Sequence, residues 1–598
     1  PLTDIKNYEG TVYQKKEVKR LELEDARALF KKVGVEGSQE EIDSVIEEYY
    51  GHALSLILLT KYLVEDFGGD INKAKDIPPF HSDKEAGGKA HRILLWYERQ
   101  LGEEQRAFMR LFSLFRGAVR EEDFEGVFQA KMETEMNQAL RAMSSFSFKR
   151  MVDNLFDRRL ISKGQDDTYA SHPLIKNYFE SIFEEEDKKL CHKRIYQYFG
   201  EYAPEQPETL EEMQPLFEQV YHGCAAGLYD EVAEYVYWEK IYRGVEYFIV
   251  KKLGAWEIDL SLVRTFFPEG DFSQMPLVSE KNVQSFLLNE AGLALLNTGR
   301  PKEAEEPLLL SAKISGELKD WREISMRYQN LADLQFLTGE LESGFESAKK
   351  ALDAAGKAKF DNYIVNSKAY LAWILHLLGK SEEASKVFRQ AGELEIKIPS
   401  LAGIFYADFI ISFKRIDEAF ELTKQNLEIC QRNNWPNDIS RCHRCLGAIE
   451  RIKGKPNEAE VHLQNALEIA RNVGMPELEI EALLEFGRLH LDKGKHEDAV
   501  RDAKEVLKIC ERTCFKFYEP EAEVVLGMTY QALNDIEQAK TFAHSAYKKA
   551  IAMNYRWPEG DAAHLLGEIY LATGDNVNAR EWLEKAVGCR QEILDPEV

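Results

Sequence analysis

The stretch NEAGLALLNTGRPKEAEEPLLLSA, residues 289–312, contains the pattern that decides the fold. A small residue, Gly292, is followed seven positions later by Gly299 and five further on by Ala304. The same spacing recurs at Ala332, Gly339 and Gly344; at Ala372, Gly379 and Ala384; at Gly447, Gly454 and Ala459; at Gly487, Gly494 and Ala499; and at Gly567, Gly574 and Ala579. Two further copies carry Lys414 or Asn534 at the turn position. The chain therefore has an internal repeat of about 40 residues.

Each repeat predicts a pair of helices. Small residues let the two helices approach closely, and glycine or asparagine between them adopts the positive φ of the turn. One such pair cannot bury its apolar face alone, whereas eight stacked pairs form a solenoid with a long concave surface. Residues 278–598 resemble tetratricopeptide repeats in a 40-residue version. The predicted fold class is mainly α: a helical domain and a winged-helix domain, followed by a tetratricopeptide-repeat superhelix.

A solenoid of this kind predicts a protein or peptide ligand on the concave face. We expect the inward positions of each first helix at −6, −3, +1 and +4 from the small residue. These positions hold four arginines and three aromatic residues: Arg441, Arg444, Arg451 and Arg488, with Phe336, Trp373 and His376. A basic groove flanked by aromatic residues suits an acidic peptide or a phosphate-bearing ligand. The alternative is that the arginines pair with glutamates of neighbouring repeats, as surface charges commonly do.

Composition excludes several classes of protein. The net charge of −26 argues against a general nucleic-acid binder, because neutralising phosphates requires excess Lys and Arg. Eight cysteines in 598 residues favour a reducing compartment. No apolar run reaches the roughly 18 residues of a membrane span. We therefore expect a soluble cytoplasmic protein with no membrane partner. The CHRC motif at 442–445 lacks a second ligand pair, so we predict structural cysteines and no metal site.

The first 280 residues are also helical, without the repeat. Helices are expected at about 90–116 and 121–130. Residues 144–179 then predict a helix, a short strand, a polar hairpin, a second strand and a helix beginning at Pro173. A three-helix unit closed by a hairpin is typical of a winged helix. Ser171 and His172 would cap the last helix, where the helix dipole favours an anion. His172 is therefore either a phosphate contact or a solvated capping residue.

This order of segments resembles the signal-transduction ATPases with numerous domains, the STAND class. YYGHALSLILLTKYL (49–63) is similar to the class's Gly-x-Pro-Leu-Ala-Leu helix, with Ala53 in place of proline, and SHPLIKNYF (171–179) is similar to its winged-helix motif. MQPLFEQVYHGCAAGLYDEV (213–232) looks like the connector of bacterial members. The resemblance implies five segments: a nucleotide-binding remnant (1–20), a helical domain (21–101), a winged-helix domain (102–186), a helical connector (187–277) and the repeats (278–598).

The resemblance also implies a function. His172 would contact the β-phosphate of bound ADP, with Gly51 and Leu54 as weaker nucleotide contacts. ADP or ATP with Mg would serve the full-length protein, and ligand binding to the repeats would favour nucleotide exchange and self-oligomerisation that activates an N-terminal effector, for example in bacterial immunity. The family's winged helix serves interdomain packing, so nucleic acid is not an expected partner.

The sequence contains no Gly-x-x-x-x-Gly-Lys-Ser/Thr phosphate loop. We expect the strands carrying that motif to precede residue 1. As given, the chain should hold no catalytic residues, should bind no cofactor alone and should not hydrolyse ATP. The alternative function is a passive repeat scaffold with a decayed nucleotide half, and Ala53 is the feature that favours it.

Overall fold

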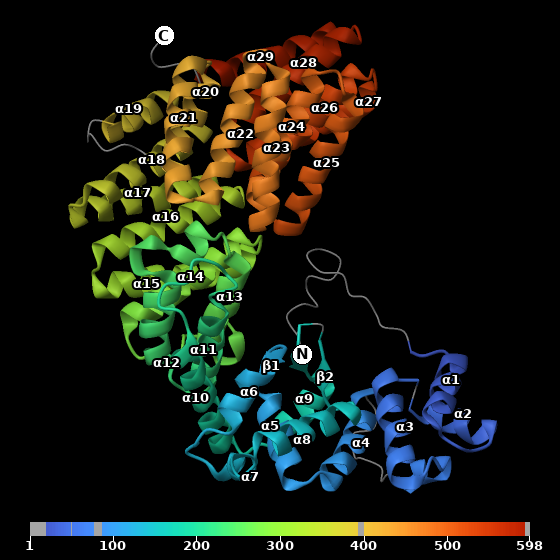
Figure 1. Cartoon of the computed structure of the whole chain (residues 1–598). Coiled ribbons are helices and arrows are strands. Elements are labelled where there is room, and N and C mark those ends of the chain that lie inside the picture. Colours follow the sequence, from blue (N-terminus) through green and yellow to red (C-terminus); the bar gives the residue numbers. More distant parts are fainter. Residues whose placement is uncertain (1–19, 50, 77–85, 165, 393–399, 593–598) are drawn as a thin grey trace. The chain divides into compact units, whose positions relative to one another are not determined.

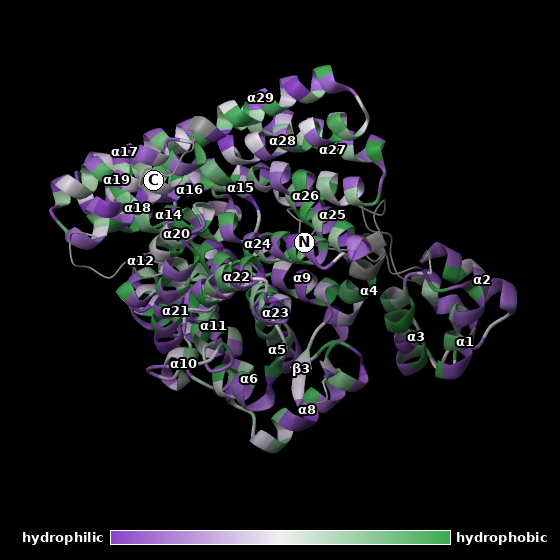
Figure 2. Cartoon of the chain, turned by 90° about the horizontal axis from the view of Figure 1, so that it is seen from above, coloured by the Kyte–Doolittle hydropathy of each residue, from purple (hydrophilic) through white to green (hydrophobic). Residues whose placement is uncertain are grey.

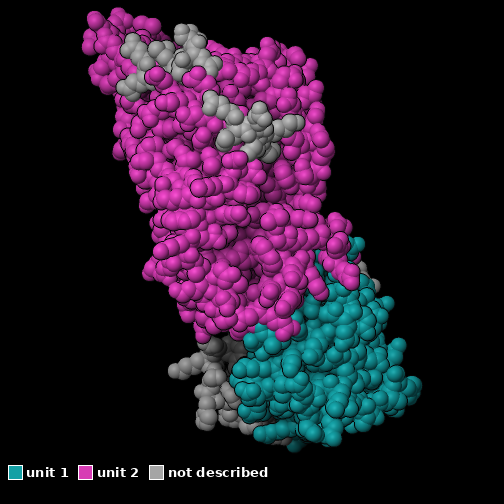
Figure 3. Space-filling view, turned by 90° about the vertical axis from the view of Figure 1, so that its left-hand side faces the viewer, with its two compact units in different colours: residues 1–204, 212–228 teal, residues 205–211, 229–598 magenta. Residues whose placement is uncertain are grey.

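The computed structural model describes residues 20–592 apart from residues 50, 77–85, 165 and 393–399. It divides into two compact units. Unit 1 comprises residues 1–204 and 212–228, and unit 2 comprises residues 205–211 and 229–598 (Figure 3). The expected nucleotide-binding remnant, 1–20, lies outside the described residues except for Arg20.

The first part of unit 1 is helical, as predicted. Local signals fix its helix ends: Ser38 and Glu41 form a capping box at the start of α2, and Gly34 and Gly68 take left-handed conformations after α1 and α3. The four helices are α1 (Leu23–Val33), α2 (Gln39–Glu48), α3 (Ala53–Phe67) and α4 (Ala86–Gln100).

The second part of unit 1 adds a small antiparallel sheet with strand order β1-β3-β2. The predicted order of helix, strand, hairpin, strand and helix over 144–179 is confirmed. The helix expected at 90–116 is instead two helices, because Gly102 caps a new one. The winged-helix assignment itself stays a prediction. The elements are α5 (Glu103–Ser113), β1 (Val119–Arg120), α6 (Glu121–Phe128), α7 (Gln138–Arg141), α8 (Ser145–Asp157), β2 (Ser162–Lys163), β3 (Thr168–Ala170) and α9 (Pro173–Ser181).

The predicted connector, 187–277, is shared between the two units. Helices α10 (Glu185–Tyr202) and α11 (Gln214–Ala225) belong to unit 1. Unit 2 begins with short α12 (Tyr229–Glu231), a π-helix at Val232–Tyr242 and α13 (Trp256–Val263). Buried Tyr237 donates a hydrogen bond to buried Asp259, 2.7 Å away, which ties the π-helix to α13.

The rest of unit 2 consists of helix pairs, eight among the described residues, in agreement with the eight predicted repeats (Figure 1). Apolar and polar residues alternate along these helices (Figure 2), as expected where each helix buries one stripe. The pairs are α14 (Lys281–Asn297) with α15 (Pro301–Leu318), α16 (Trp321–Leu337) with α17 (Leu341–Ala358), α18 (Asp361–Leu377) with α19 (Ser381–Gly392), α20 (Ser400–Ser412) with α21 (Ile416–Asn433), α22 (Pro436–Ile452) with α23 (Pro456–Val473), α24 (Pro476–Asp492) with α25 (His496–Thr513), α26 (Glu519–Ala532) with α27 (Ile536–Met553), and α28 (Arg556–Ala572) with α29 (Asn576–Glu592).

The small residue of each repeat lies where the two helices touch. A Cβ on Gly447 would stand 2.5 Å from Leu463 of the partner helix, and one on Gly292 would stand 2.5 Å from Leu308. At the turn, Gly299 has φ +84° and Asn534 has φ +61°. The repeat spacing in the sequence therefore reports both a close helix contact and a left-handed turn.

Unit 2 is a superhelix whose successive turns touch. Asn554 donates to Glu342 across 212 residues, at 3.3 Å, and Asn434 donates to the Lys252 carbonyl across 182 residues, also at 3.3 Å. With a 40-residue repeat, a separation of 212 residues corresponds to about five repeats per turn. The first helices of the later repeats consequently surround a common interior.

Candidate ligand-binding cavity and histidine pair

The interior of unit 2 contains a cavity of about 470 Å³. Its walls come from the first helices of seven repeats (α16, α18, α20, α22, α24, α26 and α28) and from the segment Lys516–Tyr518 before α26. All seven residues that the repeat spacing placed inward line this cavity: Phe336, Trp373, His376, Arg441, Arg444, Arg451 and Arg488. Its volume is that of a site for a small molecule or short peptide. Whether these residues bind a partner stays a prediction.

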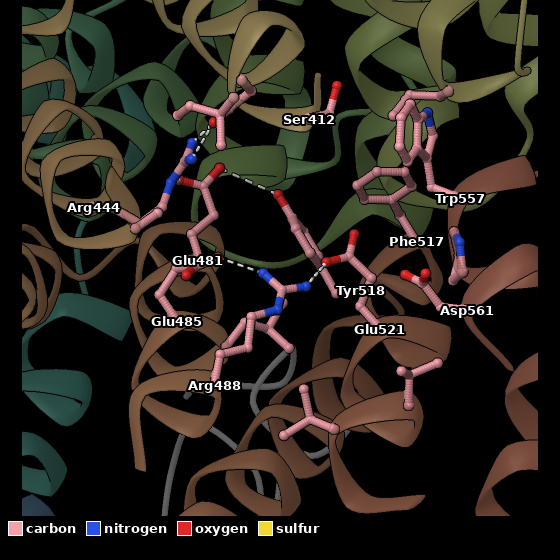
Figure 4. A pocket seen from close by; sticks show the side chains of 18 of the residues that line it. Ser412, Arg444, Glu481, Glu485, Arg488, Phe517, Tyr518, Glu521, Trp557 and Asp561 are labelled. Atoms are coloured by element: carbon pink, nitrogen blue, oxygen red, sulfur yellow. Dashed lines mark hydrogen bonds and ion pairs between the residues drawn. The ribbon is translucent and has the colours of Figure 1, made fainter. Parts of the chain in front are cut away.

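One side of the cavity is aromatic. Trp373 stacks on Phe405 with ring centroids 5.3 Å apart, and Phe517 stacks on Tyr555 at 4.7 Å. Trp557, labelled beside Phe517 in Figure 4, comes from α28. These rings form a rigid apolar surface, because aromatic side chains have few rotatable bonds and pack against one another.

The facing side carries the arginines, and each pairs with a carboxylate from a neighbouring repeat. Arg441 donates to Glu477 at 2.7 Å, Arg444 to Asp408 at 2.7 Å and Arg451 to Asp492 at 2.9 Å. Arg488 bonds to both Glu485 and Glu521 (Figure 4). The pairing across repeats, which was the alternative to a ligand role, is therefore present.

The expectation of a basic groove is not met. Beside its four arginines, the cavity is lined by eight carboxylates: Asp408, Glu477, Glu481, Glu485, Asp492, Glu521, Asp561 and Glu568. The arginines are neutralised within the wall, so the lining as a whole is acidic. An acidic or phosphate-bearing ligand would meet like charge here.

Burial and neighbouring charge shift the carboxyl groups in opposite directions. Burial opposes ionisation of Glu485, but Arg488, Arg451 and Arg444 outweigh it and lower its pKa to about 2. Burial raises the pKa of Glu477. Burial and the nearby charge of Glu477 also raise the pKa of Asp333, on α16. His376 is neutral, because burial lowers its pKa to about 3.

The repeat register in the sequence could have predicted part of the acidic lining. The register that selected the arginines also places Asp408, Glu481, Glu521 and Asp561 inward, the first at +1 and the others at −6. Tyr518 and Trp557 were missed, because they enter the cavity from the starts of the first helices, outside that register.

In unit 1, the predicted nucleotide contact His172 caps α9. Its Nδ1 accepts a hydrogen bond from the Leu174 amide at 3.2 Å, so the remaining ring proton lies on Nε2. Pro173 has no amide proton, and the Ile175 amide donates to the His172 carbonyl. An anion at this helix start would therefore meet the His172 Nε2–H, because the first-turn amides are absent or already used.

A second histidine, which sequence reasoning missed, lies close by. His52 caps α3, and its Nδ1 accepts from the Ser55 amide at 3.3 Å. Burial lowers the pKa of His172, and the proximity of His52 lowers it further. Burial lowers the pKa of His52 as well. Near neutral pH both rings are uncharged and each carries its proton on Nε2.

The two weaker nucleotide candidates have structural roles. Gly51 has φ +62°, and its carbonyl accepts from the Leu21 amide at 3.0 Å. Leu54 is half-buried and packs against the core of unit 1. The structure gives neither residue a feature that points to a nucleotide.

Cys442 and Cys445 of the CHRC motif are both fully buried in the core of their repeat. Among the described residues, no group of three or more His, Cys, Asp or Glu side chains could hold a metal ion. None of the helices that the structure describes is both long and apolar enough to cross a membrane.

Sequence comparison assigns the repeats. Residues 438–512 and 560–591 match sequence models of the tetratricopeptide repeat. These segments are tetratricopeptide repeats. Their presence supports a role for unit 2 in protein interaction. No curated protein shows significant sequence similarity to the chain.

Comparison with solved structures finds several distant similarities. A STAND protein with a tetratricopeptide repeat sensor from Pyrococcus horikoshii is 15% identical over 95% of this chain and 72% of its own, with a TM-score of 0.38. A Rap protein complexed with competence and sporulation factor is 11% identical over 70% of this chain and 95% of its own, with a TM-score of 0.34. The Cut9–Hcn1 complex of the APC/C is 13% identical, covering 92% and 86% of the two chains, with a TM-score of 0.44. Identities this low say nothing about function.

Proposed function

We propose that the chain is the sensor-bearing part of a STAND-class regulatory switch. Unit 2 binds a protein or peptide trigger in its interior cavity, and unit 1 contributes to a nucleotide site. Trigger binding favours the state that exchanges ADP for ATP and self-associates, which activates an effector in the full-length protein. The trigger acts only through a difference in affinity for the two states, because equal affinity shifts nothing.

The observation that carries the proposal is the convergence of the predicted inward residues on one cavity. Seven positions, chosen by a repeat register spanning more than 150 residues from Phe336 to Arg488, line the same space. In a solenoid without an interior cavity, these seven residues would not line one common space. The enclosed aromatic wall supports a ligand that enters the superhelix and contacts several repeats together.

The histidine pair, His52 and His172, supports the part of the proposal that places a nucleotide site in unit 1. A phosphate oxygen accepts hydrogen bonds, and the Nε2–H groups of His172 and His52 are donors on neighbouring helix starts. These two side chains would hold the phosphate of ADP from one side. The bound Mg-nucleotide would supply the charge that distinguishes the resting state from the active one. The passive scaffold needs no such donors.

Nucleotide binding separates the switch from the scaffold. We would titrate the full-length protein with a fluorescent ADP analogue and repeat the titration with His172→Ala, His52→Ala and the double variant. His544→Ala, on α27 of unit 2, is the matched control. The switch predicts binding that weakens in each unit 1 variant, by roughly tenfold in the double variant, and that is unchanged in the control.

The opposite outcomes are equally informative. Equal binding by the double variant would show that the nucleotide is held elsewhere. A full-length protein that binds no nucleotide, yet captures the same partners with and without His172, would be the scaffold. Light scattering on the same samples would show whether nucleotide changes the oligomeric state.

A further inference from the structure

The cavity of unit 2 has more negative than positive charge, and the excess is concentrated at one place. Arg441 and Arg444 form ion pairs with three carboxyl groups: Asp408, Glu477 and Glu481. Burial raises the pKa of nearby Asp333 to about 8, so that group is protonated near neutral pH. Two guanidinium groups therefore contact three carboxyls, and one more cation entering here would find incompletely balanced charge.

Among these carboxyl groups, Glu481 has the weakest hydrogen bonding. Its Oε1 accepts from the Tyr518 hydroxyl at 3.3 Å and lies 3.5 Å from the Arg441 Nε. Its Oε2 is 3.7 Å from the nearest guanidinium nitrogen, on Arg444, which is too far for a hydrogen bond. Within the part of the chain that the structure describes, this buried oxygen has no hydrogen-bond donor.

Six further buried atoms of the cavity wall also lack a hydrogen-bond partner among the described residues. They are the Glu485 Oε2, the Trp373 Nε1, the His376 Nδ1 and the Nε atoms of Arg441, Arg444 and Arg451. The Glu485 Oε2 lies 3.4 Å from the Arg451 Nε, within an ion pair. Glu485 is 6% exposed and His376 is 3% exposed, so solvent reaches them little. Native proteins rarely leave buried polar atoms unpaired, and a ligand is one way to satisfy them. Carboxylate oxygens require a donor, and an indole N–H requires an acceptor such as a peptide carbonyl.

The aromatic wall favours the same kind of ligand. Phe517 and Trp557 lie across the cavity from Arg444, Glu481 and Arg488, and Tyr518 extends between them to donate to Glu481 (Figure 4). Aromatic faces attract guanidinium and ammonium groups and also pack against apolar side chains. A carboxylate or phosphate would instead be repelled by both the ring faces and the excess acid.

We propose that the cavity binds a short peptide segment that presents a lysine or arginine to Glu481 and an adjacent aromatic or aliphatic side chain to the Trp373 and Phe405 rings. The proposal rests on the sensor role of unit 2 and specifies its ligand. The cation supplies the donors that the Glu481 and Glu485 oxygens lack, and the peptide carbonyl accepts from Trp373.

The test uses the whole chain and three mixtures of capped, fluorescently labelled peptides of about six residues, in which the fixed pair is intended to enter the cavity and the flanking residues to remain outside it. One mixture fixes an Arg-Phe pair, the second Gln-Phe and the third Glu-Phe, with all other positions varied. Binding is measured by fluorescence anisotropy at roughly 50 mM and roughly 300 mM salt. The Arg-Phe mixture should bind roughly tenfold tighter than Gln-Phe, and the higher salt should reduce that difference.

Glu481→Gln should remove most of the preference for Arg-Phe and leave Gln-Phe binding nearly unchanged. The matched control is Glu479→Gln on the same helix, because Glu479 pairs with Arg471 and does not line the cavity. If Glu481→Gln does not fold, Glu485→Gln removes a carboxylate that lines the same cavity and should also weaken Arg-Phe binding, because the pKa of Glu485 is lowered to about 2 and the group is ionised.

Two results would overturn the proposal in different ways. Tightest binding by the Glu-Phe mixture, or equal binding by all three, would leave a peptide sensor whose ligand is not cationic. No binding by any mixture would reject peptide sensing by this cavity, and with it the proposed function of unit 2.

Discussion

Trp557 and His376 meet across 181 residues of sequence. The Trp557 indole donates to the His376 carbonyl oxygen at 3.0 Å, and the two ring centroids are 4.8 Å apart. The contact joins α28, in the last repeat, to α18, in the third. It lies on the wall of the cavity, so it links the closure of the superhelix to the shape of the candidate site.

Removing this contact should loosen two distant helices together. Trp557→Ala loses the indole hydrogen bond and its half-buried ring packing, and should lower the free energy of unfolding by ~2 kcal/mol. Amide hydrogen exchange should increase in both α18 and α28. Trp582→Ala is the control, because Trp582 packs on His544 and Tyr547 of the adjacent helix α27. Faster exchange in α28 alone would show that the turns are not coupled.

Adding a single methyl group to the small residue of a repeat should destabilise the folded chain. Gly447→Ala places a Cβ 2.5 Å from the fully buried Leu463 and should destabilise the chain by about 1–3 kcal/mol. Gly316→Ala, in helix α15 with no heavy atom within 4 Å of the new Cβ, should stabilise it by up to about 1 kcal/mol. Urea unfolding of both variants checks the pair. Effects of the same sign would contradict the helix contact.

His376 should make stability depend on pH. Burial lowers its pKa to about 3, below its usual value of 6.5. Between these values the unfolded chain binds a proton that the folded chain does not, so stability is full above pH 6.5 and falls as the pH drops. His376→Phe should flatten this slope by up to about 1.4 kcal/mol per pH unit. The measurement is urea unfolding across this range, with exposed His564→Phe as the control. An unchanged slope in His376→Phe would show that the imidazole is accessible to protons.

Arg488 should stabilise the folded chain, although it lines the cavity, because it pairs with two carboxylates. Arg488→Ala leaves Glu485 and Glu521 without their shared partner, and should cost about 1–3 kcal/mol near neutral pH. The double variant Arg488→Ala with Glu521→Gln should recover part of the loss, which a double-mutant cycle measures. No recovery would place the arginine's contribution in packing and not in the charge pair.

The sequence predicts the repeats because their signals are local. A close helix contact requires a small residue and a tight turn requires a positive φ, so Gly292 and Gly299 report both within eight positions. The same register identifies one helix face, and that face lines the cavity. Counting only arginines on it predicted a basic groove, although Glu481 occupies an equivalent position.

The remaining features depend on arrangements that no local pattern encodes. Trp557 reaches His376 because of the pitch of the superhelix, which sums small rotations over about five repeats. His52 lies near His172 because unit 1 folds two helix starts together, across 120 residues of sequence. The resemblance to the STAND class indicated His172, but the family pattern has no histidine requirement at position 52.

The contacts between turns also constrain how this protein can change over evolutionary time. In an open solenoid, adding or deleting one repeat only alters the length, because each unit touches its neighbours alone. Here a 40-residue insertion between α18 and α28 would carry Trp557 one unit past His376 and separate Asn554 from Glu342. We therefore expect homologues that keep these pairs to conserve the number of repeats between them, while insertions and losses concentrate in loops.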